Sequence, residues 1–182
     1  MRHLFRWAAF FLAGFLLCCC VGVVVFDALV VRPALSKIES TIASGAPSER
    51  EPPSAVVDMV HRAYGSHLKY LVARDALAAS PSQVDGLSHL SRQFTELGLG
   101  LLLLLHLSEP QVATAYLSWA YMGPGVRGFA VASDRYLKVP LENLTPAQAA
   151  RLVAIAHAPS AYLASPERLD RRTRYLLSLQ PQ

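Results

Sequence analysis

An uncharged run of twenty residues close to the N-terminus constrains this chain more than any other feature. It extends from Trp7 to Phe26 and reads WAAFFLAGFLLCCCVGVVVF. A helix rises about 1.5 Å per residue, so the run reaches roughly 30 Å, the thickness of the hydrocarbon core of a bilayer. Arg2 and Arg6 precede the run and Asp27 follows it. Basic residues before a span predict a cytoplasmic N-terminus, with the rest of the chain extracytoplasmic or periplasmic.

The alternative interpretation of this run is a cleaved signal peptide. Signal peptides have apolar regions of about 7–15 residues and a cleavage site of small residues. This run is longer and ends in Val-Val-Val-Phe-Asp, which lacks an A-x-A pattern. A lipoprotein site at Cys18, Cys19 or Cys20 is also a poor match, because Leu or Cys precedes each cysteine. We therefore expect a retained, single-pass anchor in the inner (cytoplasmic) membrane.

The composition outside the anchor suits one ordinary domain and excludes several classes of function. The net charge of +4 is spread along the chain and does not indicate a nucleic-acid partner. A mild excess of Lys and Arg suits a position beside anionic membrane lipid. All three cysteines lie within the apolar run, so the outer domain has neither a disulfide nor a thiol nucleophile.

The sequence divides into three parts. Residues 1–31 form a cytoplasmic tip and the anchor, residues 32–54 a linker, and residues 55–182 the outer domain. Residues 44–54 are polar and contain three prolines, which predicts an extended or mobile segment. Residues 55–79 are amphipathic with basic residues among the apolar ones, typical either of a surface helix or of a helix that faces the membrane.

Helical signals continue to the C-terminus. Residues 97–107 read LGLGLLLLLHL, too few to span a bilayer, and indicate a buried core helix or one that dips into the membrane interface. Capping boxes at Ser108–Gln111 and Thr145–Gln148 predict two helix starts, and Ser165–Pro166 predicts a third. No segment shows sustained strand alternation, so the predicted fold class is mainly α.

No standard catalytic motif stands out from spacing alone, whether H-E-x-x-H, P-loop, G-x-S-x-G or paired cysteines. From Tyr116, however, the chain reads YLSWAYMGPGVRGFAVASDRYL and then LENLTPAQAARLVAIAHAPSAYLASPERLDRRTRYLL. This resembles the C-terminal half of glycosyltransferase family 51, which comprises the peptidoglycan transglycosylase domains of penicillin-binding proteins and their monofunctional relatives. The family pattern is Y-L-N-x-x-Y-F-G-x-G-x-x-G, followed by L-T-x-x-E-A-A and A-P-S; Ser118 stands where the family has Asn. The resemblance is best over residues 92–177 and implies a truncated lysozyme-like helical transglycosylase domain.

The resemblance also implies a set of site residues. Arg92-Gln-Phe-Thr-Glu96 lies where the family has R-K-x-x-E, at the family's distance before Tyr116. Glu96 would be the catalytic carboxylate that handles the pyrophosphate of a lipid-linked sugar, often with a divalent metal such as Mg²⁺ or Mn²⁺. Arg92, Gln93, Tyr116 and Arg127 would bind substrate, although Gln93 replaces the family's lysine. The residues themselves assign no cofactor and no metal ligand.

Two upstream motifs of the family are degraded. Its E-D-x-x-F-x-x-H-x-G motif, whose Glu is the general base, has its nearest match at residues 71–75, with Arg74 in place of the base. Its G-x-S-T-I-T-Q-Q motif has its nearest match at residues 86–93, which overlaps R-K-x-x-E, so the intervening segment is shortened.

These departures lead to two hypotheses. The first is a catalytically degenerate, membrane-anchored protein of cell-wall synthesis that binds lipid II, a glycan strand or another cell-wall synthase. Its basis is that an arginine cannot act as a base at neutral pH. The alternative is a divergent, active peptidoglycan glycosyltransferase that polymerises lipid II through Glu96 with Asp75 or another acid.

Overall fold

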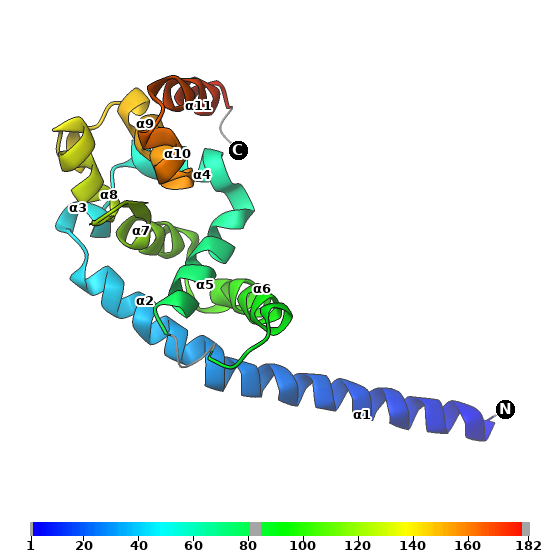
Figure 1. Ribbon diagram of the computed structural model, residues 1–182. Helices are drawn as coiled ribbons and strands as arrows, with labels where there is room; N and C mark the ends of the chain where they lie inside the picture. Colours follow the sequence, from blue (N-terminus) through cyan, green and yellow to red (C-terminus); the bar gives the residue numbers. More distant parts are fainter. Residues whose placement is uncertain (1, 81–84, 180–182) are drawn as a thin grey trace.

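A long N-terminal helix leads away from a helical body (Figure 1). The computed structural model describes residues 2–80 and 85–179. Helix α1 (Arg2–Phe26) continues through a π-helical segment, η1 (Asp27–Val31), into α2 (Arg32–Ser44). The large apolar side chains of α1 from Phe10 to Val25 are exposed, whereas Phe26 packs against the core. Within the described ranges this continuous helix is the one that is long and apolar enough to cross a membrane.

The prediction of an extended or mobile segment at residues 44–54 is wrong for residues 47–50, which form the one-turn helix α3 (Pro47–Arg50). Pro47 suits the first turn of a helix, where its missing N–H costs nothing. The Glu49 side chain is buried and accepts hydrogen bonds from the backbone N–H groups of Ala130 (2.9 Å) and Ala46 (3.3 Å). The carboxylate of Glu49 therefore ties this turn to the body.

The amphipathic stretch at residues 55–79 forms two helices, α4 (Ser54–Tyr64) and α5 (Leu68–Ala78), joined by the 3₁₀ turn η2 (Gly65–His67). The break lies at Gly65, whose φ of +50° is a conformation that other residues rarely adopt. Both helices place their apolar residues in the core: Val56, Met59 and Val60 of α4, and Leu68, Val72, Ala73, Ala76 and Leu77 of α5.

Helix α7 (Glu109–Trp119) is the central helix of the body, in contact with α2, α3, α4, α5 and α8. It starts at the predicted capping box, where the Ser108 N–H donates to Gln111 Oε1 at 2.9 Å. Helix α6 (His89–His106) precedes it, packs against α5, and begins eight residues before the apolar run that predicted it. Leu99, Gly100 and Leu103 of α6 are buried, whereas most of its other leucines are exposed.

A short antiparallel hairpin follows α7, with strands β1 (Tyr121–Gly123) and β2 (Val126–Arg127). Its strands are too short to show alternation in the sequence, which is why the sequence did not predict them. After it come α8 (Phe129–Ala132), the π-helical η4 (Ser133–Leu137), the 3₁₀ turn η5 (Leu141–Asn143), α9 (Pro146–His157), α10 (Pro159–Leu163) and α11 (Pro166–Ser178). The predicted cap at Thr145 is present, because its Oγ1 accepts the Gln148 N–H at 3.3 Å. The mainly α fold class is thus confirmed.

Candidate functional site

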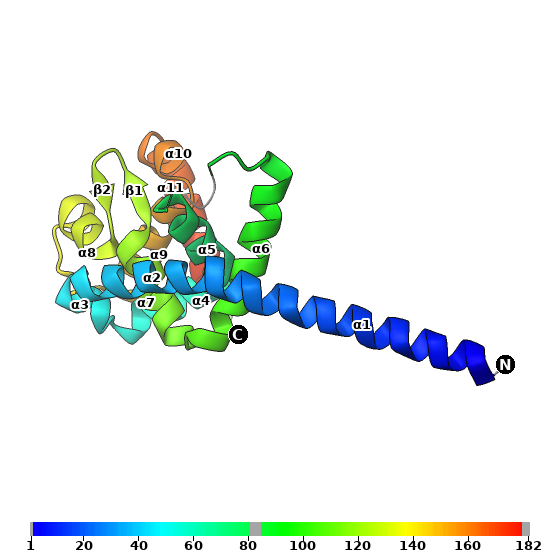
Figure 2. The ribbon, with the colours of Figure 1, turned by 90° about the horizontal axis from the view of Figure 1, so that it is seen from below.

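A cavity of about 430 Å³ opens between α5, α7, the hairpin and the junction of α9 with α10. Figure 2 shows the hairpin, α5 and α10 on the same side of α2. The polar and aromatic side chains that line the cavity are Tyr64, Arg74, Asp75, Tyr116, Trp119, Tyr121, Arg127 and His157. They come from four separate regions of the sequence, so the fold and not local spacing creates this site.

Arg74 and Asp75, adjacent on α5, give the cavity one cation and one carboxylate. The guanidinium of Arg74 lies 3.4 Å from Asp75 Oδ1, and the arginine is the more exposed of the two. Burial raises the pKa of Asp75, while the positive charges of Arg74 and Arg127 oppose that rise. Burial therefore destabilises the negative charge of Asp75, and the guanidinium groups of Arg74 and Arg127 stabilise it.

A pair of tyrosines forms the adjacent wall of the cavity. Tyr116 on α7 is buried, and its hydroxyl donates to the hydroxyl of Tyr64 at 2.9 Å. Burial raises the pKa of Tyr116 well above its ordinary value, and burial also raises that of Tyr64. Both phenols are therefore neutral, and the Tyr64 hydroxyl retains its own proton for donation to a ligand.

The hairpin carries Arg127 and Tyr121 to the cavity. It is held against the body where the Gly128 N–H donates to the Ala120 carbonyl at 3.0 Å, and where the Tyr136 hydroxyl donates to the Met122 carbonyl at 2.9 Å. The first bond closes the base of the hairpin next to Arg127, and the second ties strand β1 to Tyr136. A further hydrogen bond stabilises the turn: the Ala130 N–H, just after the hairpin, donates to the carboxylate of Glu49.

His157 contributes an imidazole at the end of α9. Its ring lies 6.4 Å from the ring of Tyr64 and 6.4 Å from that of Tyr162, centroid to centroid. Burial lowers its pKa, and the charge of Arg172 lowers it further. The imidazole is therefore neutral at pH 7 and gains a positive charge only in more acidic solution.

The structure brings two of the five predicted site residues to this cavity. Tyr116 and Arg127 line it, whereas Arg92, Gln93 and Glu96 lie on the N-terminal half of α6, outside its lining. Arg92 and Gln93 are exposed and Glu96 is half-buried. Within the described ranges, no group of three His, Cys, Asp or Glu side chains gathers as a metal site would require.

The sequence did not indicate a role in this site for Tyr64, Trp119, Tyr121 or His157. Tyr64 lies in the stretch that the sequence predicted only to be amphipathic. A signal existed for His157, which immediately precedes the Ala-Pro-Ser motif. No local signal marks Tyr64, because its role depends on the contact between α4 and α7.

This set of groups suits an anion with several oxygens. Two guanidinium groups can each make paired, charge-assisted hydrogen bonds, and a tyrosine hydroxyl can add a neutral one. Aromatic faces at Tyr121 and Trp119 offer apolar contact beside the charges. The one carboxylate that lines the cavity, Asp75, lies beside a cation rather than opposite a second acid.

Comparison with known proteins agrees with these features. The model of the transglycosylase family matches residues 65–180, well over half of the chain. Penicillin-binding protein 1A of Neisseria gonorrhoeae is 34% identical over 90 residues, or 48% of this chain, and that of Mycobacterium tuberculosis is 34% identical over 96 residues, or 53%. The chain spans only 11% and 12% of the lengths of these two relatives. The match encloses the whole cavity apart from Tyr64, and the chain belongs to the transglycosylase family that its sequence resembles.

Proposed function

We propose that this chain is a membrane-anchored, peptidoglycan glycosyltransferase-like protein of cell-wall synthesis that binds lipid II but does not polymerise it. The observation that carries this proposal is Arg74. It lines the cavity, and it stands at the base position in the nearest match to the family motif that carries the general base.

Glycan polymerisation needs a base that removes a proton from the attacking sugar hydroxyl, and donors that stabilise the leaving pyrophosphate. A guanidinium stays protonated at any physiological pH and cannot accept that proton. Donors for the pyrophosphate are present, because Arg74 and Arg127 both line the cavity. The site therefore retains the means to hold a pyrophosphate and lacks the group that starts the reaction.

Charge-assisted hydrogen bonds explain how the cavity could still bind a pyrophosphate without a general base. Each guanidinium can form two parallel bonds to phosphate oxygens. Arg92 on α6 is exposed and can add a third cation, whereas Gln93 cannot replace the charge of the family's lysine. Binding of this kind weakens with salt, because it is electrostatic and partly open to solvent.

The anchor determines where in the cell this binding would occur. We propose the inner membrane as its location, with residues 1–31 as cytoplasmic tip and anchor, residues 32–54 as the connection, and residues 55–182 as a periplasmic or extracytoplasmic domain. Lipid II is itself a membrane lipid, so an anchored domain meets it in two dimensions. A glycan strand or a second cell-wall synthase would meet the domain at the same surface.

The alternative function is a divergent but active glycosyltransferase, and one observation favours it. Asp75 lines the cavity, and burial raises its pKa, as expected of a general base. Glu96, the other candidate acid, lies outside the lining. An active enzyme would therefore depend on Asp75 more than on Glu96.

Binding of lipid II by the detergent-solubilised full chain tests the proposal. We expect saturable, salt-sensitive association, and Arg127→Ala should weaken it about tenfold or more, since a hydrogen bond to a charged group contributes about 1.5–3 kcal/mol. Arg135→Ala is the matched control, because Arg135 is exposed and lies outside the cavity lining. No saturable binding, or equal losses in both variants, would contradict the proposal.

A further inference from the structure

Helix α6 carries an exposed apolar stripe that the function proposed above does not use. Its members are Leu90, Phe94, Leu97, Leu101 and Leu104, each between 41% and 64% exposed. Their spacing of four, three, four and three residues places them on one side of the helix. Leu105, at 75% exposed, lies beside the stripe.

The opposite side of α6 faces the body. Leu99 and Leu103 are fully buried there, and Arg92 and Glu96 share that side by the same helical spacing. The helix is therefore two-sided, with the stripe directed away from the rest of the domain. Large apolar side chains exposed in a row indicate a surface that binds either another protein or a membrane.

The position of α6 beside α1 favours the membrane. Figure 2 shows α6 running across the direction of α1, at the end of the body from which α1 departs. A Cβ built at Gly98 would lie 3.0 Å from the ring of Phe26, the last residue of the apolar run. Helix α6 therefore touches the proposed anchor at the end of its apolar run.

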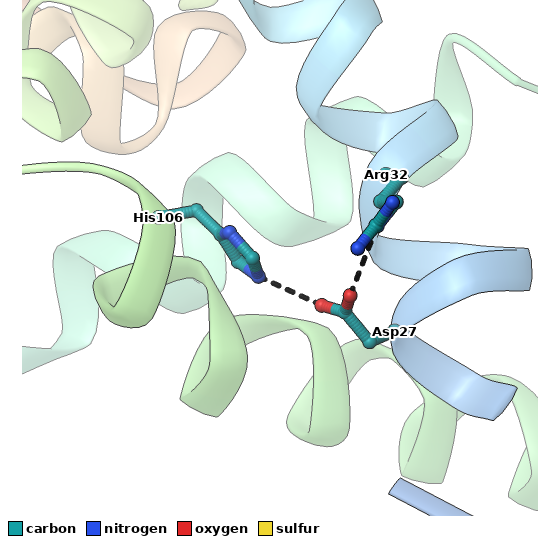
Figure 3. Close-up of polar contacts among 3 residues, drawn as sticks. All are labelled: Asp27, Arg32 and His106. Carbon is teal, nitrogen blue, oxygen red and sulfur yellow. Dashed lines mark hydrogen bonds and ion pairs between the residues drawn. The ribbon is translucent and has the colours of Figure 1, made fainter. Parts of the chain in front are cut away.

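A hydrogen bond between side chains joins the C-terminal end of α6 to the anchor. His106 Nε2 lies 2.7 Å from Oδ1 of Asp27, and the Arg32 Nε donates to the other oxygen at 3.2 Å (Figure 3). Asp27 is the first charged residue after the apolar run, so it marks where the chain leaves the hydrocarbon. His106 therefore meets the anchor at the boundary between lipid and water.

We propose that α6 is a second membrane-contacting element, which lies in the plane of the outer interface with its stripe among the acyl chains and is held to α1 by the Asp27–His106 pair. The inference rests on the proposed anchoring by α1. An interfacial amphipathic helix has this form, with an apolar side, a polar side and insufficient length of apolar sequence to span. Two attachments at an angle orient the body on the membrane, whereas one helix would only tether it.

Fluorescence quenching on the full chain tests this proposal. The native Cys18, Cys19 and Cys20 lie in α1 and are replaced by alanine, and single cysteines are introduced by Phe94→Cys, Leu101→Cys or Arg92→Cys. Each protein is labelled with a polarity-sensitive dye and placed in phosphatidylcholine–phosphatidylglycerol vesicles containing doxyl-labelled lipid. We expect the probe at positions 94 and 101 to lose most of its fluorescence, and the probe at position 92, on the opposite side, to lose little.

A protein that keeps only Cys19 reports anchoring separately, since its probe should be quenched wherever α1 is inserted. Quenching at position 19 with none at 94 and 101 would overturn the proposal and leave anchoring and lipid II binding intact. A blue shift at 94 and 101 that grows with protein concentration and resists lipid quenching would also overturn it, because a second copy would then cover the stripe.

The contact between Asp27 and His106 is tested by Asp27→Asn and His106→Gln, with Arg32→Gln as the control. Arg32 is the most exposed member of the group, with 73% of its side chain accessible. We expect the first two variants to reduce quenching at position 101 toward the level of position 92, and Arg32→Gln to leave it unchanged, with helix content retained in all three. Unchanged quenching in Asp27→Asn would show that the pair does not hold α6.

Discussion

Two ionisable side chains in the cavity, Asp75 and His157, make its net charge depend on pH. Burial raises the pKa of Asp75, so its negative charge disappears on acidification earlier than for a free aspartate. Burial and Arg172 lower the pKa of His157, so its positive charge appears only below the ordinary range of about pH 6.5. Both changes make the cavity more positive as the pH falls.

Anion binding in the cavity should therefore strengthen from pH 8 to pH 5. The measurement is the affinity for lipid II at constant ionic strength. The double variant Asp75→Asn, His157→Gln should show a flatter profile, and at pH 8 should bind more tightly than the parent because it lacks the carboxylate charge. Affinity that falls on acidification would mean that the anion does not bind among these groups.

At the residue scale the sequence predicted part of this site. Tyr116 and Arg127 follow from the family resemblance, and both line the cavity. The prediction of Glu96 came from the match of residues 92–96 to R-K-x-x-E and from their distance to Tyr116, and Glu96 lies outside the cavity lining. The contact between α5 and α7, which places Asp75 near Tyr116, is a long-range feature that no local pattern contains.

At the scale of elements, the turn after α7 depends on its glycines and on the helix that replaced the expected linker. Gly128 has a φ of +81°, and a Cβ there would lie 2.5 Å from Glu49 Oε1. The family pattern includes these glycines but does not indicate Glu49 as their partner. Three prolines suggested an extended chain at residues 44–54, whereas Pro47 in the first turn and the burial of Glu49 against the turn favour α3.

Gly128→Val should therefore destabilise the domain by about 2–4 kcal/mol, from backbone strain and from displacement of a buried carboxylate. Gly125→Val is the matched control, since Gly125 also has a positive φ, of +69°, but nothing lies within 4 Å of a Cβ there. Thermal unfolding measures both, and the control should lose only the strain component. Equal melting temperatures of the two variants would mean that Glu49 does not hold the turn.

At the scale of the whole molecule, one continuous helix from α1 through η1 to α2 joins the proposed anchor to the body. Residues 32–44, which were expected to begin the linker, continue this helix as α2. The sequence did predict the mainly α class, because capping boxes and apolar periodicity are local signals. It could not predict how α6 and α1 lie against each other, since the pair of Asp27 with His106 joins residues 79 positions apart.

We propose that this family member binds lipid II without extending a glycan chain. The most direct test incubates the detergent-solubilised full chain with labelled lipid II and Mg²⁺ or Mn²⁺, beside an active family member, and separates the products on a gel. General-base catalysis typically contributes about 10²–10⁴-fold, so with Arg74 in place of the base we predict bound lipid II and no polymer. Polymer from the parent chain that disappears in Asp75→Asn or Glu96→Gln would contradict this account and show that another carboxylate serves as the base.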